Sequence, residues 1–224
     1  MLQPDPEVPL ERFDEWLRPQ ADITIIDLTS DDVPSIDEVG DGIIVLGGRM
    51  SSHVDLPWVA DVHRLMVEAT TSVPLLGICL GHQLLAEALG GEVTDEHPDG
   101  PEEGAYELTW AEAAAADPVM AGAVAMGGPV AMSHRDVVTR LPDGVVELAA
   151  SDTFPAAAFR AGLAWGVQFH PEASPELLAR WSALSANPDD TILERMRAVD
   201  DALQPTCRAI ADGFAQVVRE HAAR

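Results

Sequence analysis

The chain has 224 residues, 47% of them hydrophobic, which is enough for one sizeable packed domain. Its 38 acidic residues outnumber 13 basic residues, all of them arginine, and the net charge is −25. A surface of this charge repels phosphate backbones and anionic lipids, so we expect neither nucleic acid nor a membrane as a partner. The acidic residues are dispersed rather than blocked, which favours a role in solubility or in tolerance of high salt.

Targeting segments and disulfides are not expected. No apolar run reaches the length of a membrane span, and residues 1–7 lack the charged-then-apolar order of a signal peptide. The two cysteines, Cys79 and Cys207, are far apart and lack the spacing of a disulfide framework. These features predict a cytoplasmic protein with free thiols.

The first part of the chain alternates helical and strand patterns. Apolar residues at helical spacing predict a helix over 10–17, and β-branched residues predict a strand over 22–28. A buried strand is expected over 42–46, before two glycines. A helix that starts with proline follows over 57–69, and an apolar strand over 73–78. Buried strands alternating with helices indicate a parallel sheet covered on both faces.

The second part changes character. Short strands separated by Gly, Pro and Asp turns are predicted over 106–110, 129–133 and 145–149. Residues 156–160 and 164–169 form a predicted hairpin. The expected fold is therefore a single α/β domain, with a central, largely parallel sheet flanked by helices and a small antiparallel β extension.

The C-terminal part is expected to be helical. A helix is predicted over 175–184, and one long helix over 190–222 with a break at Pro205. We therefore divide the chain into a domain over 1–184 and a helical extension over 185–224.

The stretch 73–91 contains the strongest chemical signal. The apolar strand ends in Gly77-x-Cys79-x-Gly81, and helical spacing follows over 84–89. A cysteine between two glycines at a strand-to-helix turn is typical of a nucleophile elbow, where the helix N-terminus favours the thiolate. The alternative is an ordinary buried cysteine.

A base for this nucleophile is available at His170. His170 follows the predicted strand 164–169, which places it at the carboxyl edge of the sheet. Pro171 directs the chain, and Glu172 can meet the far nitrogen of the imidazole. His-Pro-Glu alone is a weak motif, but combined with the elbow it predicts a Cys-His-Glu triad.

Residues 77–83 (Gly-Ile-Cys-Leu-Gly-His-Gln) and 168–172 (Gln-Phe-His-Pro-Glu) resemble the class I, or triad, glutamine amidotransferases. Leu46-Gly47-Gly48 and the motif over 132–136 are most similar to stand-alone members that resemble the amidotransferase domain of GMP synthase. The resemblance spans about residues 5–182. It implies the flavodoxin-like fold of that family.

The resemblance also implies roles. Cys79 attacks the side-chain amide of glutamine, His170 acts as base and then protonates ammonia, and Glu172 orients His170. The backbone N–H groups of Gly48 and Leu80 form the oxyanion hole. The positions implied to bind substrate are Gln83, Ser133, His134, Arg135 and Asp136.

Departures from the family pattern concern the pocket and the first strand. Arg49 replaces a common proline and Arg135 a common glycine, so each could clamp a carboxylate, block the pocket or point to solvent. Ala156 and Ala157 replace polar residues. The first strand is nearly absent, because residues 1–3 begin where it should end. We therefore expect either a start placed late or a sheet that lacks one strand.

The remaining candidate residues have simpler interpretations. His82 is predicted to pack at the elbow helix and Cys207 in the core, while His134 either lines the pocket or makes a structural hydrogen bond. Four histidines are predicted at the surface: His53, His63, His97 and His221. A metal site built from His134, Asp136, His170 and Glu172 lacks a recognised ligand spacing, so neither a metal nor a cofactor is expected.

Three functions remain open. The first is a glutamine amidohydrolase that supplies ammonia to an ATP-dependent synthetase on another chain, because this sequence has no P-loop and no lysine. The second is a stand-alone γ-glutamyl hydrolase or peptidase that acts on another γ-glutamyl small molecule. The third is a catalytically idle binding relative.

Overall fold

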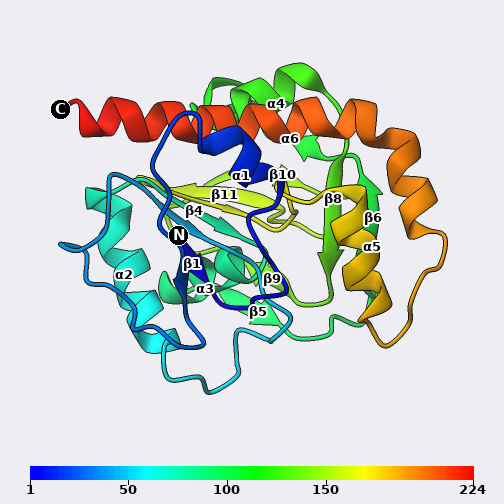
Figure 1. Cartoon of the computed structure of the whole chain (residues 1–224), viewed down its shortest axis with the longest axis horizontal. Helices are drawn as coiled ribbons and strands as arrows, with labels where there is room; N and C mark the ends of the chain where they lie inside the picture. The colour runs from blue at the N-terminus through cyan, green and yellow to red at the C-terminus, as the bar shows by residue number, and fades with distance from the viewer.

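A central eight-stranded sheet organises the molecule (Figure 1). The computed structural model describes residues 1–224. The strand order is β2-β1-β3-β4-β12-β11-β10-β7; the first five strands are parallel and the last three pair antiparallel. The strands are β1 (Leu2–Gln3), β2 (Ile26–Asp27), β3 (Ile43–Val45), β4 (Leu75–Ile78), β7 (Thr109–Trp110), β10 (Val146–Ala150), β11 (Ala158–Ala161) and β12 (Ala164–Val167).

Helices cover both faces of this sheet. They are α1 (Arg12–Leu17), α2 (Val59–Ser72), α3 (Leu80–Ala88), the 3-10 helix η1 (Glu112–Ala116), α4 (Ala121–Met126), α5 (Pro175–Ala183) and α6 (Ile192–Ala222). Neighbouring strand residues belong to opposite cores: Leu75 packs with α2 and α3, and Leu76 packs with α1 and α6. The protein is thus a three-layer α/β domain, as predicted.

Two small antiparallel sheets extend the domain beside the central one. β5 (Glu92–Thr94) pairs with β9 (Val137–Arg140), and β6 (Glu102–Tyr106) pairs with β8 (Val130–His134). The predicted antiparallel extension is therefore present. Its strands β6 and β8 both contact α6.

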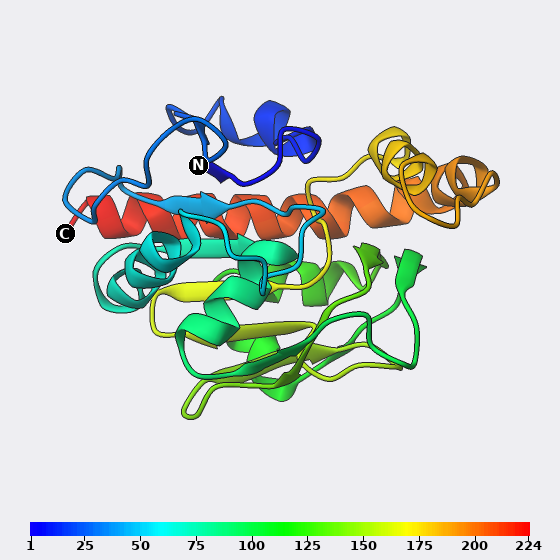
Figure 2. The same cartoon turned by 90° about the horizontal axis from the view of Figure 1, so that it is seen from below.

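The long helix α6 spans the length of the molecule (Figure 2). The prediction of this helix is confirmed, but the expected break is wrong: the helix continues through Pro205. A proline inside a helix costs about 3 kcal/mol, and here the neighbouring Leu203 and Cys207 are fully buried against the sheet. Tertiary packing therefore outweighs the local penalty. The boundary between residues 184 and 185 stays a prediction.

The first strand is short but occupies an inner position. Leu2–Gln3 forms β1, which pairs with β2 on one side and β3 on the other. The sheet therefore does not lack this strand. The amino group of Met1 also donates a 2.7 Å hydrogen bond to the carbonyl of Thr24.

Other boundaries differ from the predictions. The strand expected over 22–28 shrinks to β2, the one expected over 106–110 divides between β6 and β7, and α3 begins at Leu80 rather than at residue 84. Four short elements were not predicted: β5, β9, η1 and α4. None of the helices combines the length and apolar character of a membrane span.

Candidate active site

Cys79 stands in the turn between β4 and α3 with a positive φ of 50°, which a non-glycine residue rarely adopts. A Cβ on Gly77 would lie 2.5 Å from the carbonyl oxygen of Gly81, and a Cβ on Gly81 would lie 2.3 Å from that of Val45. Both flanking positions therefore require glycine. Strain of this kind costs of order 1–3 kcal/mol and persists only where the surrounding structure enforces it. The turn has the backbone geometry expected of a nucleophile elbow.

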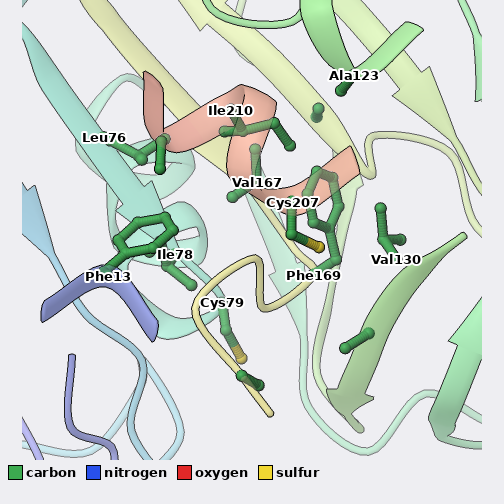
Figure 3. Packing of buried hydrophobic residues seen from close by; sticks show 14 of the residues in the cluster. Phe13, Leu76, Ile78, Cys79, Ala123, Val130, Val167, Phe169, Cys207 and Ile210 are labelled. Carbon is green, nitrogen blue, oxygen red and sulfur yellow. The ribbon is translucent and has the colours of Figure 1, made fainter. Parts of the chain in front are cut away.

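His170 lies in the loop that follows β12, and its side chain is close to Cys79 in space. A Cβ on Gly47 would be 3.0 Å from Cε1 of His170 and 3.5 Å from Cβ of Cys79, so the two side chains flank the same glycine. Figure 3 shows Cys79 beside Ile78 at the edge of the apolar cluster. The backbone N–H of His170 donates to the carbonyl of Ala131 at 2.8 Å, which fixes this loop to β8.

Glu172 lies behind the imidazole. Nδ1 of His170 donates to Oε1 of Glu172 at 2.7 Å, and both side chains are buried. The indole ring of Trp181 covers the imidazole at a centroid distance of 4.6 Å. The tautomer and the ring orientation are therefore set by one carboxylate and one aromatic face.

Electrostatics favour the charged form of His170. Burial alone lowers the pKa of this imidazole, but the negative charges of Glu172 and Cys79, and hydrogen bonds to both, raise the pKa well above 6.5. These contacts favour a protonated imidazole beside the sulfur of Cys79.

A cavity of about 980 Å³ opens beside the sulfur. Cys79, His170 and Gly48 line it. Gly48 and Leu80 are neighbours, since a Cβ on Gly48 would lie 2.8 Å from a methyl carbon of Leu80. Leu80 is the first residue of α3 and Gly48 follows β3, so two chain segments place these residues side by side next to Cys79.

The residues implied to bind substrate all line this cavity. The carbonyl of Ser133 is 4.0 Å from Sγ of Cys79. Nε2 of Gln83 donates to the carbonyl of Asp136 at 2.9 Å and to Oε1 of Gln168 at 3.3 Å. The Gln83 amide is therefore occupied in holding the turn after β8.

Arg135 and Asp136 reach the cavity from that turn. Arg135 is exposed and lines the cavity. Oδ1 of Asp136 accepts the N–H of Glu96 at 2.8 Å. Burial, together with the nearby charges of Asp95 and Glu96, raises the pKa of Asp136.

Arg49 does not present a free guanidinium. Its side chain forms a two-point ion pair with Asp5, with Nε to Oδ2 at 2.7 Å, and its backbone N–H also donates to that carboxylate. The sequence left open whether Arg49 clamps a substrate carboxylate, blocks the pocket or points to solvent. In the structure its side chain lines the cavity, and its guanidinium is paired with Asp5 of the same chain.

The other histidines differ in their exposure. His82 is fully buried against Phe159, as predicted, and burial lowers its pKa to about 3. His53 is exposed as predicted and bridges Glu87 and Asp95 at 2.7 and 2.9 Å. Three others are half-buried rather than at the surface: His63, His97 and His221.

The metal alternative finds no support in the positions of the side chains. No three His, Cys, Asp or Glu side chains form a metal-binding group in this chain. Cys207 is a core residue of α6, as predicted, and burial raises its pKa to about 12.

Two charged residues of this region were not identified by the sequence analysis. Asp5, which holds Arg49, lies in a Pro-rich segment without a chemical motif. Glu102 lies opposite His134 in the β6–β8 ladder, and their side chains are 3.0 Å apart. Only the strand register brings this pair together, so no spacing along the chain indicates it.

The turn at Cys79, the buried His170 and the cavity are accompanied by a match to a known protein family. The family model for glutamine amidotransferase class-I matches residues 15–180. The chain belongs to the class-I glutamine amidotransferase family. Cys79, His170 and Glu172 all fall within the matched range.

Relatives of this amidotransferase-family chain include both short and long proteins. A glutamine-hydrolyzing GMP synthase subunit of Halobacterium salinarum is 34% identical over 158 residues, which are 70% of this chain and 79% of that protein. The glutamine-hydrolyzing GMP synthase of Porphyromonas gingivalis is 41% identical over 133 residues, which are 58% of this chain and 24% of that protein. The chain therefore corresponds to a minor part of the longer relative.

A solved structure with the same architecture is the glutamine amido transferase from Methylobacillus flagellatus. It superposes with a TM-score of 0.81 at 24% identity, and the match covers 96% of this chain and 92% of that chain. At this identity the likeness shows the shared fold.

Proposed function

We propose that this chain is a glutamine amidohydrolase that uses Cys79, His170 and Glu172. The observation that supports it best is that the strained elbow cysteine and the carboxylate-paired histidine flank Gly47 and face one cavity. A family model alone does not indicate the reacting atoms, and this arrangement supports the choice of these three side chains.

In the proposed reaction the Cys79 thiolate adds to the side-chain amide carbon of glutamine. The oxygen becomes an oxyanion that accepts hydrogen bonds from the N–H groups of Gly48 and Leu80. When the C–N bond breaks, His170 transfers its proton to the leaving nitrogen and ammonia departs. A glutamyl thioester then remains on the sulfur.

Hydrolysis of the thioester restores the enzyme. Neutral His170 takes a proton from water as the water oxygen bonds to the carbonyl carbon, and the C–S bond then breaks. Glutamate and the thiolate–imidazolium pair are the products. Glu172 stays ionised throughout and holds Nδ1–H, so Nε2 is the nitrogen that exchanges the proton.

The test is ammonia release from glutamine by the purified chain, with Cys79→Ala as the comparison. We expect Cys79→Ala to abolish release, and a glutamine-like diazo-ketone to label Cys79 and no other residue. An active Cys79→Ala variant would overturn the role of the thiol. A wild-type Cys79 that stays unlabelled would favour the catalytically idle alternative.

We further propose that the ammonia passes to a synthetase on another chain. The relative in Halobacterium salinarum is named as one subunit of GMP synthase, and the match covers 79% of it. The chain has no lysine to bind a nucleotide phosphate. Stimulation of glutamine hydrolysis by an added ATP-dependent synthetase would support this step, and unchanged hydrolysis would argue against coupling.

A second substrate class is favoured by the cavity itself. Its volume of about 980 Å³ exceeds what one glutamine side chain needs, and exposed Arg135 lines it. The same thioester chemistry would then act on a γ-glutamyl amide with a larger leaving amine. A higher kcat/KM for γ-glutamyl dipeptides than for glutamine would support this alternative.

A further inference from the structure

Glu102 is a buried carboxylate that the proposed reaction does not use. It lies on β6 with 3% exposure, directly across the ladder from His134 on β8. Oε2 of Glu102 lies 3.0 Å from Nε2 of His134. Burying a carboxylate is costly unless it is paired, so this arrangement has to be maintained by its partners.

Both oxygens of this carboxylate are bound. Oε1 accepts a 2.6 Å hydrogen bond from the hydroxyl of Ser151. That hydroxyl oxygen in turn accepts the backbone N–H groups of Thr153 and Phe154 at 3.2 and 2.9 Å. Glu102 is therefore anchored to the loop after β10, and its position does not depend on His134 alone.

The protonation of the pair follows from these contacts. Burial opposes ionisation, but hydrogen bonds from His134 and Ser151 outweigh it and lower the pKa of Glu102. An ionised carboxylate only accepts, so Nε2 of His134 is the donor. Nδ1 is then the remaining nitrogen of the ring; it is buried and has no hydrogen-bond partner in the chain, so Glu102 and Ser151 provide the polar contacts that hold this pair in place.

His134 belongs to the wall of the cavity beside the nucleophile. It lines the cavity, and it follows Ser133, whose carbonyl is 4.0 Å from Sγ of Cys79. The same strand, β8, accepts the backbone N–H of His170 at Ala131. A shift of the His134 ring would therefore alter the wall against which the substrate lies.

We infer that Glu102 is a positioning residue for substrate binding: it holds the His134 ring through Nε2 and so fixes the cavity wall of Ser133 and His134, against which the amino-acid end of a γ-glutamyl substrate lies. This inference rests on the proposed amidohydrolase function. Glu102 acts through His134 and touches no reacting atom.

A purely structural role predicts a different result. If Glu102 only joined β6 to β8, its loss would lower the thermal stability without a change in affinity for substrate. A positioning role predicts weaker binding with the reactivity of the thiol unchanged, because the three residues of the triad lie on other elements than β6 and β8.

The experiment uses inactivation of the full chain by a glutamine-like diazo-ketone, which separates binding (KI) from reaction (kinact). The variant is Glu102→Gln, which keeps the shape and loses the charge. We expect KI to rise about tenfold and kinact to stay within about twofold. Alkylation by iodoacetamide, which has no glutamyl group, should proceed at the wild-type rate.

Two further variants make the result specific. Glu147→Gln removes an exposed carboxylate on β10 and should change neither constant. Glu102→Gln combined with His134→Gln should bind no more weakly than His134→Gln alone, because Glu102 acts through that ring.

Every outcome decides the question. An unchanged KI in Glu102→Gln, or additive losses in the double variant, overturns the positioning role. A fall in the iodoacetamide rate also overturns it, because the effect would then reach the triad. If the wild type neither hydrolyses glutamine nor reacts with the diazo-ketone, the proposed function fails, and this inference fails with it.

Discussion

Two histidine–glutamate pairs lie beside one cavity, and they differ in how the chain brings their members together. His170 and Glu172 are two positions apart in one loop, and their side chains are 2.7 Å apart. His134 and Glu102 are 32 positions apart on paired strands, and theirs are 3.0 Å apart. Both carboxylates are buried. The same pairing therefore arises once from local sequence and once from strand register, and only the first is visible before folding.

The largest expected effect is on kcat, and it distinguishes the His170–Glu172 pair from the His134–Glu102 pair. Glu172→Gln removes the charge that stabilises the His170 imidazolium, so we expect kcat for glutamine hydrolysis to fall about 10²- to 10⁴-fold, with KM within about twofold. Steady-state ammonia release measures this. Glu102→Gln in the same assay should act mainly on KM. A rise in KM with unchanged kcat in Glu172→Gln would mean that the pairs do not differ in role.

The turn around Cys79 also depends on close backbone contacts, and the Glu102–His134 pair on β6 and β8 does not share them. In Gly81→Ala the new methyl group would lie 2.3 Å from the carbonyl oxygen of Val45. We expect the free energy of unfolding to fall by about 1–3 kcal/mol, and alkylation of Cys79 to slow. Urea denaturation measures the first quantity.

Gly40→Ala is the matched control for that experiment. No atom lies within 4 Å of a Cβ built at Gly40, so its free energy of unfolding should stay within about 0.5 kcal/mol of the wild type. Equal effects of the two substitutions would show that the close approach of Gly81 to Val45 does not limit the side chain at position 81.

His82 extends the comparison to a buried histidine without a carboxylate. Burial lowers its pKa to about 3, whereas the charges beside His170 raise the pKa of that imidazole. Below pH 6.5 the unfolded chain protonates His82 and the folded chain does not. Stability is therefore lost as the pH falls from 6.5 toward 3, by up to about 1.4 kcal/mol per pH unit. His170 has the opposite sign: its contribution is lost as the pH rises through its folded pKa.

The His82 contribution is measured as a slope. The free energy of unfolding at pH 7, 6 and 5 should fall less steeply in His82→Leu than in the wild type, because all other titrating groups are shared. Parallel slopes would contradict a neutral, buried His82.

The smallest effect is expected at Arg49. Its guanidinium is bound to Asp5 and its side chain is half exposed, so Arg49→Gln should change KM for glutamine by less than about twofold and the free energy of unfolding by less than about 1 kcal/mol. Ammonia release and urea denaturation measure these. A tenfold rise in KM would instead show that Arg49 leaves Asp5 for the substrate.

The sequence was sufficient for most of the fold. The alternation of buried strands and helices up to Gly81 predicted the parallel sheet, because strand residues that face two helical layers are apolar on both sides. It failed where local preference and packing disagree. Pro205 predicted a break, yet buried neighbours keep α6 continuous. β5 has only three residues and none is buried, and β9 has two buried valines followed by two exposed residues, so neither shows the alternation of a strand.

At the site, sequence alone predicted a triad of Cys79, His170 and Glu172, because an elbow and a two-residue loop are short-range structures whose geometry follows from neighbouring residues. Only the tertiary structure decided that Glu102 faces His134 and that Asp5 binds Arg49. These contacts join segments 32 and 44 positions apart. Nothing in the intervening chain encodes such distances, because they are set by strand register and by the packing of separate loops around one cavity.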